Sequence, residues 1–280
     1  MGWFLRSGRA AYGVYAEAGE RHIALIAAGV AFFGMFGIFP GIAAIISVFG
    51  LMADPSVVSQ ELALMEDVIP PETYAIFQGQ VDQLLSAPSD ALSWATAVSI
   101  LLALWSSRAA VAAMIGGINA IEGVPTRSGI RQALVAFGLT VALVALAITA
   151  LLTVVILPIV LAFLPLPQFT AWMLEIARWL MALFVLFGGL SILYRFGPNM
   201  APHRRPWFTV GAAGVVVAWI AASVGLSYYL TNFASYNEVY GSIGAVIGML
   251  LWLYVSAYLI LLGAVVNARL YPVQPPCGPE

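Results

Sequence analysis

Long apolar stretches, separated by short polar connections, run along almost the whole chain. A helix that crosses a bilayer needs about 20 mostly apolar residues, and six stretches meet this requirement. They are residues 23–52, 91–114, 132–163, 172–194, 207–230 and 243–267. The first and third are longer than a bilayer requires, so tilt or kinks have to absorb the excess. The pattern predicts an all-α, polytopic membrane protein with six transmembrane helices, the second of which can extend through residues 115–121.

Composition excludes an ordinary soluble protein. Of the 280 residues, 62% are hydrophobic and 9% are charged, whereas about 25% of the residues in an average soluble domain are charged. A soluble protein rarely exposes large apolar patches, but lipid can cover the outer face of a membrane protein. The first apolar stretch is too long for the hydrophobic region of a cleaved signal peptide, so we expect it to be retained as a span.

The distribution of arginine orients the six spans. The N-terminal arm, the connections 115–131 and 195–206, and the end of the last span all carry Arg. These residues are Arg6, Arg9, Arg21, Arg127, Arg131, Arg195, Arg204, Arg205 and Arg269. The alternate connections, 53–90, 164–171 and 231–242, contain no Arg. Since basic connections stay in the cytoplasm, we expect both termini there, in a bacterial inner membrane.

Three segments outside the spans differ from them in composition: an amphipathic arm, an acidic insertion and a C-terminal tail. Residues 1–22 form an amphipathic arm that we expect at the membrane interface, and residues 271–280 form a flexible cytoplasmic tail. The six-span domain occupies residues 23–270 and includes an acidic periplasmic insertion at 53–90. Apolar residues at helical spacing predict two short amphipathic helices in this insertion. They are interpreted either as a solvated lid or as a gate or docking surface for a partner.

Polar and helix-disturbing residues enter the first two spans. Pro40 removes a helical hydrogen bond and frees the carbonyl group of Phe36, so it is expected to interrupt the first span. Arg108, Asn119 and Glu122 fall on nearly the same face of the second helix and indicate a polar seam. An ionisable residue inside a membrane is a candidate functional residue, although Arg108 can also extend toward the lipid headgroups.

A second polar stripe marks the sixth span. Ser256 and Asn267 share a face with Ser242 and Gly263 at helical periodicity. Small and polar residues in a membrane span are expected to face other helices rather than lipid. The stripe is interpreted either as a packing surface or as the lining of a pathway.

Short motifs follow one another in a distinctive order along the chain. They are Ala27-Ala28-Gly29-Val30-Ala31-Phe32-Phe33 with Phe39-Pro40, Leu104-Trp105-Ser106, Asn119, Leu193-Tyr194-Arg195-Phe196 with Pro198-Asn199, Tyr240-Gly241-Ser242-Ile243-Gly244, Leu251-Trp252-Leu253-Tyr254, and Gly263-Ala264 with Asn267-Ala268. Taken together, they resemble the YihY/virulence factor BrkB family of bacterial inner-membrane proteins over nearly the whole chain. The segment that contains Arg195, Pro198 and Asn199 is the most distinctive local match.

The resemblance implies a helical inner-membrane protein with six spans, and the roles suggested for the family include envelope lipid transport and serum resistance. Some members have carried a ribonuclease label, which we take as a misassignment. One position departs from the family pattern. The family often has Glu directly after the Gly-Ala pair, where this chain has Val265. A mechanism that needs this carboxylate, such as proton coupling, is therefore put in doubt.

Three functions are compatible with these features. The first, which we expect, is a transporter or flippase of a lipid or amphipathic envelope molecule, with Arg108 facing an anionic headgroup. The second is a structural or assembly protein that binds partners within the membrane. The third is an enzyme, ribonuclease included, and it is disfavoured because His22 and His203 are isolated and no nucleophile or nucleotide-binding motif is present.

The expected ligands and partners follow from the same features. We expect no catalytic residues, no metal site and no cofactor. The expected partners are membrane lipids, with a homo-oligomer left open, and neither nucleic acid nor nucleotide is expected to bind.

Overall fold

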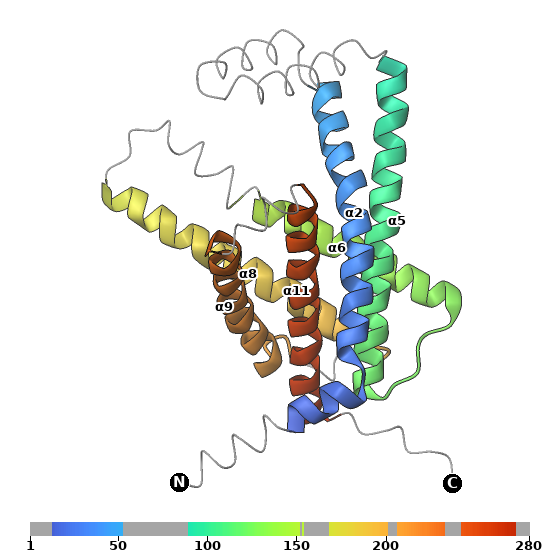
Figure 1. The fold of residues 1–280 in the computed structure, drawn as a ribbon, viewed down its shortest axis with the longest axis vertical. Coiled ribbons are helices and arrows are strands. Elements are labelled where there is room, and N and C mark those ends of the chain that lie inside the picture. The colour runs from blue at the N-terminus through green and yellow to red at the C-terminus, as the bar shows by residue number, and fades with distance from the viewer. Residues whose placement is uncertain are drawn as a thin grey trace. The chain divides into compact units, whose positions relative to one another are not determined.

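The chain folds into long helices, in agreement with the apolar pattern. The computed structural model describes residues 13–52, 89–151, 153, 168–200, 206–232 and 242–272. Its long helices, in chain order, are α2 (Ile23–Met52), α5 (Ser89–Glu122), α6 (Gly129–Leu151), α8 (Gln168–Phe196), α9 (Val210–Asn232) and α11 (Ser242–Leu270) (Figure 1). The part of the chain that is described contains no strand, so the all-α prediction is confirmed.

The number of candidate membrane spans agrees with the predicted six. Five helices among the described residues are each long and apolar enough to cross a membrane. A sixth span results if the helix Gly13–Glu20 and the helical segment Ile23–Ile38 are counted as one bent span. The predicted extension of the second span is also present, because α5 continues to Glu122. The chain is therefore a multi-pass membrane protein, and the side of the membrane on which each end lies stays a prediction.

The backbone of the first span bends before helix α2 begins, and not at Pro40. Helix α2 runs without interruption through Pro40. The bend of 64° instead separates Gly13–Glu20 from Ile23–Ile38, and His22 between them has a left-handed φ of 51°. A non-glycine residue rarely adopts such a φ, so His22 marks a sharp turn of the backbone. The predicted interruption at Pro40 is thus replaced by a turn between the N-terminal arm and the span.

The residues of three predicted segments lie mainly outside the described part of the chain. Residues 53–88 of the acidic insertion, with its two short helices, are outside it, and so are residues 1–12 of the arm and 273–280 of the tail. Tyr240 and Gly241 are outside it as well.

The chain divides into two compact units. The smaller unit, Met35–Ser107, contains the second part of α2 and the first part of α5. Within it, Gly37 lies against α5, since a Cβ atom at this position would be 3.0 Å from Oγ of Ser107. Gly37 therefore permits a close approach to α5, whereas a Cβ atom at Gly41 would have no neighbour within 4 Å among the described residues.

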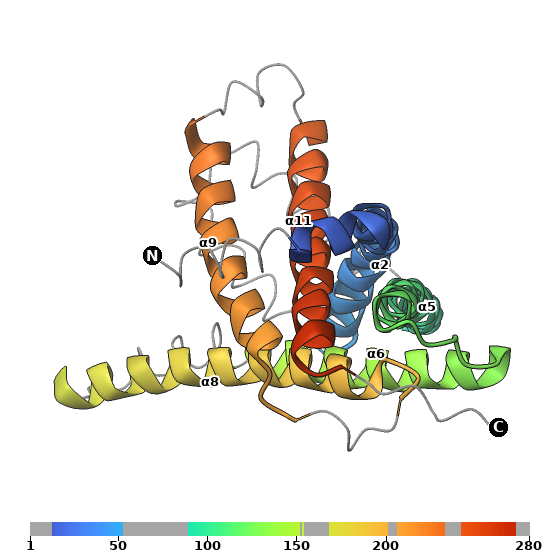
Figure 2. The ribbon, with the colours of Figure 1, turned by 90° about the horizontal axis from the view of Figure 1, so that it is seen from below.

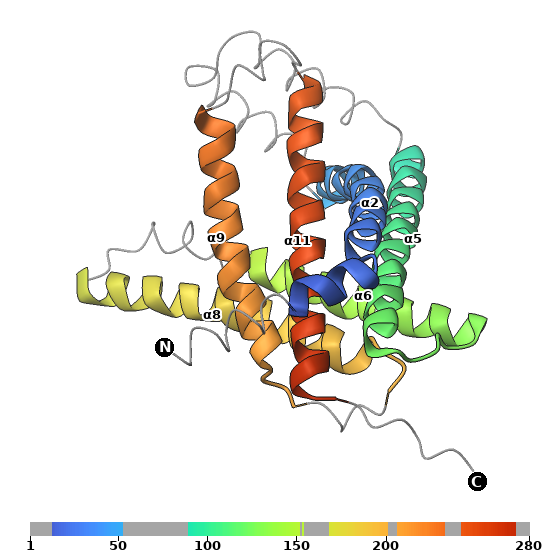
Figure 3. The same cartoon turned by 60° about the horizontal axis from the view of Figure 1, so that its bottom comes forward.

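The larger unit comprises Met1–Gly34 and Arg108–Glu280. Within it, α9 lies beside α11, and the pair formed by α6 and α8 crosses these two helices (Figures 2 and 3). Glycine permits the closest contact, because a Cβ atom at Gly211 would collide with the carbonyl oxygen of Gly263. Small residues that let two backbones approach are typical of helix packing in membranes.

The core of the larger unit is apolar and joins several helices. Its main cluster includes Ile23 and Ala27 of α2, Ile118 of α5, Tyr194 of α8 and Leu261 of α11. Val265 belongs to the same cluster and is fully buried. A carboxylate at position 265 would be desolvated among apolar side chains, so Val fits the surroundings that the rest of this chain provides.

Candidate functional site

Hydrogen bonds join the Arg-bearing segments of the larger unit at one end of its helices. Arg21, just before α2, donates to the carbonyl oxygen of Ala120 at the end of α5, over 2.9 Å. Arg269, near the end of α11, forms an ion pair with Glu17, with 2.6 Å between Nε and Oε2. We call this region, together with residues 119–131, 194–200 and 206–211, the arginine end. These contacts bring Arg21 to the end of α5 and Arg269 to the N-terminal arm, and the side of the membrane on which the Arg-bearing segments lie stays a prediction.

Arg127 holds the end of α8 at the arginine end. Its guanidinium donates over 2.6 Å to the carbonyl oxygens of Gly197 and Pro198, and over 3.4 Å to that of Phe196. The last carbonyl groups of a helix have no partner within the helix, and the negative end of its dipole favours a cation. Burial, and secondly the charge of Arg131, lower the pKa of Arg127 below its usual range. Arg127 therefore acts as a charged cap for α8.

Asn119 fixes the turn that follows α8. Its Oδ1 accepts a hydrogen bond of 2.8 Å from the backbone N–H of Asn199, and the side-chain amide of Asn199 donates over 3.0 Å to the carbonyl oxygen of Pro125. Helix α5 itself ends in a left-handed Gly123, with a φ of 66°, as many helices do. Asn119 is only 1% exposed, so this bond is sheltered from water.

The polar stripe of the sixth span is used in packing against α9. Oδ1 of Asn267, which is fully buried, accepts a hydrogen bond of 2.9 Å from the backbone N–H of Gly211, in the first turn of α9. Oγ of Ser256 accepts a hydrogen bond of 3.0 Å from Nε1 of Trp219. Tyr194 of α8 also reaches α11, since its hydroxyl donates over 2.6 Å to the carbonyl oxygen of Ile260. These bonds tie α8, α9 and α11 together.

The remaining predicted site residues are not gathered in one cavity. Arg108 and Glu122 are half-buried on α5. Arg108 precedes Asn119 by about 16 Å along the helix at 1.5 Å per residue, so the seam is a face of one helix rather than a cluster. Arg195 lies over the ring of Trp207, with 4.8 Å between Cζ and the ring centroid. Pro40 belongs to the smaller unit.

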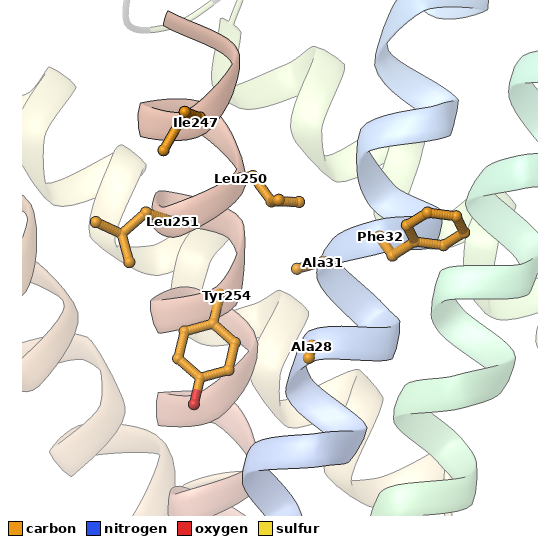
Figure 4. A pocket seen from close by; sticks show the side chains of 7 residues that line it. All are labelled: Ala28, Ala31, Phe32, Ile247, Leu250, Leu251 and Tyr254. Carbon is orange, nitrogen blue, oxygen red and sulfur yellow. The ribbon is translucent and has the colours of Figure 1, made fainter. Parts of the chain in front are cut away.

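An apolar groove between α2 and α11 was not predicted from the sequence. It has a volume of about 390 Å³ and lies within the larger unit. Its lining consists of Ala28, Ala31, Phe32, Ile247, Leu250, Leu251 and Tyr254 (Figure 4). Among these seven side chains, the hydroxyl of Tyr254 supplies the only polar atom. The motif Leu251-Trp252-Leu253-Tyr254 contains two of the lining residues, but its sequence carries no sign that α2 lies opposite.

The groove runs along one side of the contact between α2 and α11. Ala27 of α2 and Leu261 of α11 belong to the same apolar cluster, and a Cβ atom at Gly34 would lie 3.8 Å from Leu253. Ala28 and Phe32 are exposed beside this contact. On α11 the lining continues to Ile247, away from the arginine end. The groove thus opens along an apolar flank of the larger unit.

Metal-binding side chains do not cluster in the described part of the chain. No group of three or more His, Cys, Asp or Glu side chains that could hold a metal ion occurs in the described part of the chain. At the arginine end, Arg21 and Arg127 donate to backbone carbonyl groups, and Arg269 forms an ion pair with Glu17.

Comparison with known proteins identifies relatives but no solved structure. The sequence pattern of a family described as virulence factor BrkB matches residues 14–274. YfkH of Bacillus subtilis (strain 168), whose name describes it as ribonuclease-like, is 28% identical over 249 residues, which cover 87% of this chain and 88% of that protein. No solved structure matches the chain.

Shorter matches are found to UPF0761 membrane proteins. One from Tolumonas auensis is 32% identical over 98 residues, which cover 35% of this chain and 31% of that protein. Another, from Ralstonia nicotianae, is 40% identical over 80 residues, which cover 29% of this chain and 18% of that protein. The matched segments therefore span less than a third of these two relatives.

Proposed function

Because the chain belongs to the virulence factor BrkB family and its relatives include UPF0761 membrane proteins, we propose that it transports or flips a lipid or similar amphipathic molecule in the bacterial inner membrane. The single observation that carries this proposal is the groove between α2 and α11. A molecule with an acyl chain is its proposed occupant, and no reaction is proposed.

The location of the groove favours an acyl chain. Its α11 residues fall within the candidate span Val246–Leu270, and its α2 residues fall within the segment Ile23–Ile38. Residues in such spans are surrounded by lipid, whose acyl chains can enter an open apolar groove without displacing any other ligand. Burial of each additional CH2 group stabilises a chain in an apolar site by about 0.8 kcal/mol.

The lining makes a second helix a poorer occupant. Helices approach one another in membranes through small residues that leave the backbone accessible. Only Ala28 and Ala31 are small, whereas Phe32, Leu250 and Leu251 are large and partly exposed, with exposures of 53%, 38% and 39%. Large side chains at these positions hinder the close backbone approach that a second helix requires.

Arg108 is the proposed contact for an anionic headgroup. It lies in the candidate span Thr96–Glu122, in the part of α5 that belongs to the larger unit. A guanidinium inside a membrane favours a headgroup with a net negative charge over a zwitterionic one, whose ammonium group it repels. The proposal predicts that Arg108→Ala slows the flipping of phosphatidylglycerol more than that of phosphatidylethanolamine, whereas equal slowing would remove Arg108 from the headgroup path.

The experiment that tests the proposed function compares two substitutions in proteoliposomes. Ala28→Trp places a large ring in the groove, whereas Ala221→Trp adds the same ring to an exposed position of α9. Flipping of a fluorescent phospholipid is measured by quenching from outside. The proposal predicts that Ala28→Trp abolishes flipping and that Ala221→Trp preserves it. Equal rates in the two variants, or no flipping by the wild type, would contradict it.

A structural or assembly role is the second candidate, and a specific observation favours it. Three residues that could have lined a polar pathway instead bind other protein groups: Asn267 and Ser256 bind α9, and Asn119 binds the turn after α8. The groove is also apolar, so it provides no polar pathway for a lipid headgroup, although it can accommodate an acyl chain. Wild-type proteoliposomes that flip none of the tested lipids would favour this role.

A further inference from the structure

Tyr254 places a polar atom deep within the candidate span. It lies eight residues after Val246, the first residue of the span Val246–Leu270. At 1.5 Å per residue, this separation corresponds to about 12 Å along the helix. A hydroxyl group at such a depth has no water to bind, so its hydrogen-bond partner has to come from the protein or from a ligand.

The protein does not supply this partner within the described part of the chain. The hydroxyl of Tyr194 donates to the carbonyl oxygen of Ile260, but the hydroxyl of Tyr254 makes no hydrogen bond with any described residue. The Tyr254 ring stacks on that of Tyr258, with centroids 6.2 Å apart and an angle of 30° between the planes. This contact and the main apolar cluster hold the ring in place beside the groove.

On the basis of the proposed function, we infer that Tyr254 donates a hydrogen bond to an ester carbonyl oxygen of a lipid whose acyl chain occupies the groove. The chain extends from Tyr254 past Leu250 toward Ile247, where the lining is entirely apolar (Figure 4). The ester group then lies about 12 Å inside the span, much deeper than in a resting bilayer. Tyr254 is therefore a positioning residue that stabilises the lipid during its passage through the membrane.

This inference specifies the chemical class of the ligand. A diacyl phospholipid carries ester carbonyl groups, whereas its dialkyl ether analogue has the same headgroup and similar chains but no carbonyl group. A single hydrogen bond in a protein contributes about 0.5–1.5 kcal/mol. The protein is therefore expected to retain the diester about two- to tenfold better than the diether.

The test measures lipid retention directly, without depending on transport. Purified full-length protein is incubated with equal amounts of diester and diether phosphatidylglycerol, and the bound lipids are quantified by native mass spectrometry. Tyr254→Phe keeps the ring and removes the hydroxyl, and Tyr258→Phe makes the same change on the stacked neighbour outside the groove. The preference for the diester is expected in the wild type and in Tyr258→Phe, and it should be lost in Tyr254→Phe.

Two outcomes would overturn the inference. Equal retention of the two lipids by the wild type would show that no ester is recognised, and a preserved preference in Tyr254→Phe would assign the recognition to another group. Ala28→Trp separates this inference from the proposed function, because it should reduce the retention of both lipids equally. If Ala28→Trp abolishes lipid binding while Tyr254→Phe changes nothing, the groove remains the lipid site and only the role of Tyr254 is refuted.

Discussion

The arginine end and the groove between α2 and α11 use their side chains in opposite ways. At the arginine end, polar groups are bonded to backbone atoms of other segments, as Arg127 and Asn119 illustrate. In the groove, apolar side chains from two helices leave an open volume of about 390 Å³. The difference indicates that the first region stabilises the fold, whereas the second is available to a ligand. Substitutions at the two regions should therefore affect different measurements.

The largest loss of stability is expected from Gly211→Ala. The added methyl group would collide with the backbone carbonyl of Gly263, which cannot move without separating α9 from α11. Overpacking of this kind costs about 3 kcal/mol at the upper end of the usual range. Thermal unfolding in detergent micelles measures the effect. Gly214→Ala is the matched control, because its Cβ atom would have no neighbour within 4 Å among the described residues, and a similar loss there would refute the packing argument.

A smaller loss of stability is expected from Arg127→Ala. The substitution leaves the carbonyl groups at and just after the end of α8 without their charged donor, at a cost of about 2 kcal/mol. The same unfolding measurement applies. Arg131→Ala provides the comparison, since Arg131 is exposed and lies four residues away. If the two variants lose the same stability, the effect belongs to the positive charge of the segment and not to the cap on α8.

The smallest effect on stability is expected from Ala28→Trp in the groove. Ala28 is exposed, so the ring can occupy space that a lipid chain otherwise fills, and the change should stay within about 0.5 kcal/mol. If this variant unfolds at the same temperature as the wild type but loses lipid transport, the groove serves transport and not the stability of the fold. A variant that loses both properties would show that the groove is part of the structural core.

The spans could be predicted because each depends on local sequence alone. A run of about 20 apolar residues specifies a membrane helix whatever its neighbours are, and α2 begins and ends where the pattern predicted. The bend at His22 could not be predicted in this way. It results from a left-handed backbone at a residue that is not glycine, whereas Pro40, the obvious helix breaker, lies within a continuous helix.

The partners of the candidate site residues depend on segments that are distant in the sequence. The sequence singles out Asn119 because it shares a face of the second helix with Arg108. Its bond to the backbone of Asn199 exists only because the end of α8 lies against α5. Arg127 was interpreted only as a topological signal, although it caps α8. The groove likewise requires two helices from opposite ends of the chain, so neither sequence alone indicates it.

The central claim, that the groove holds a lipid chain, is tested most directly by photo-crosslinking in native membranes. A photoreactive side chain replaces Leu251 in the groove or, as a control, Ile220 on α9, since these residues have similar exposures of 39% and 44%. The account predicts that lipid adducts form at position 251 in clear excess over position 220, and that Ala28→Trp removes the excess. Equal adduct yields at the two positions, or capture of a second protein chain at position 251, would contradict it.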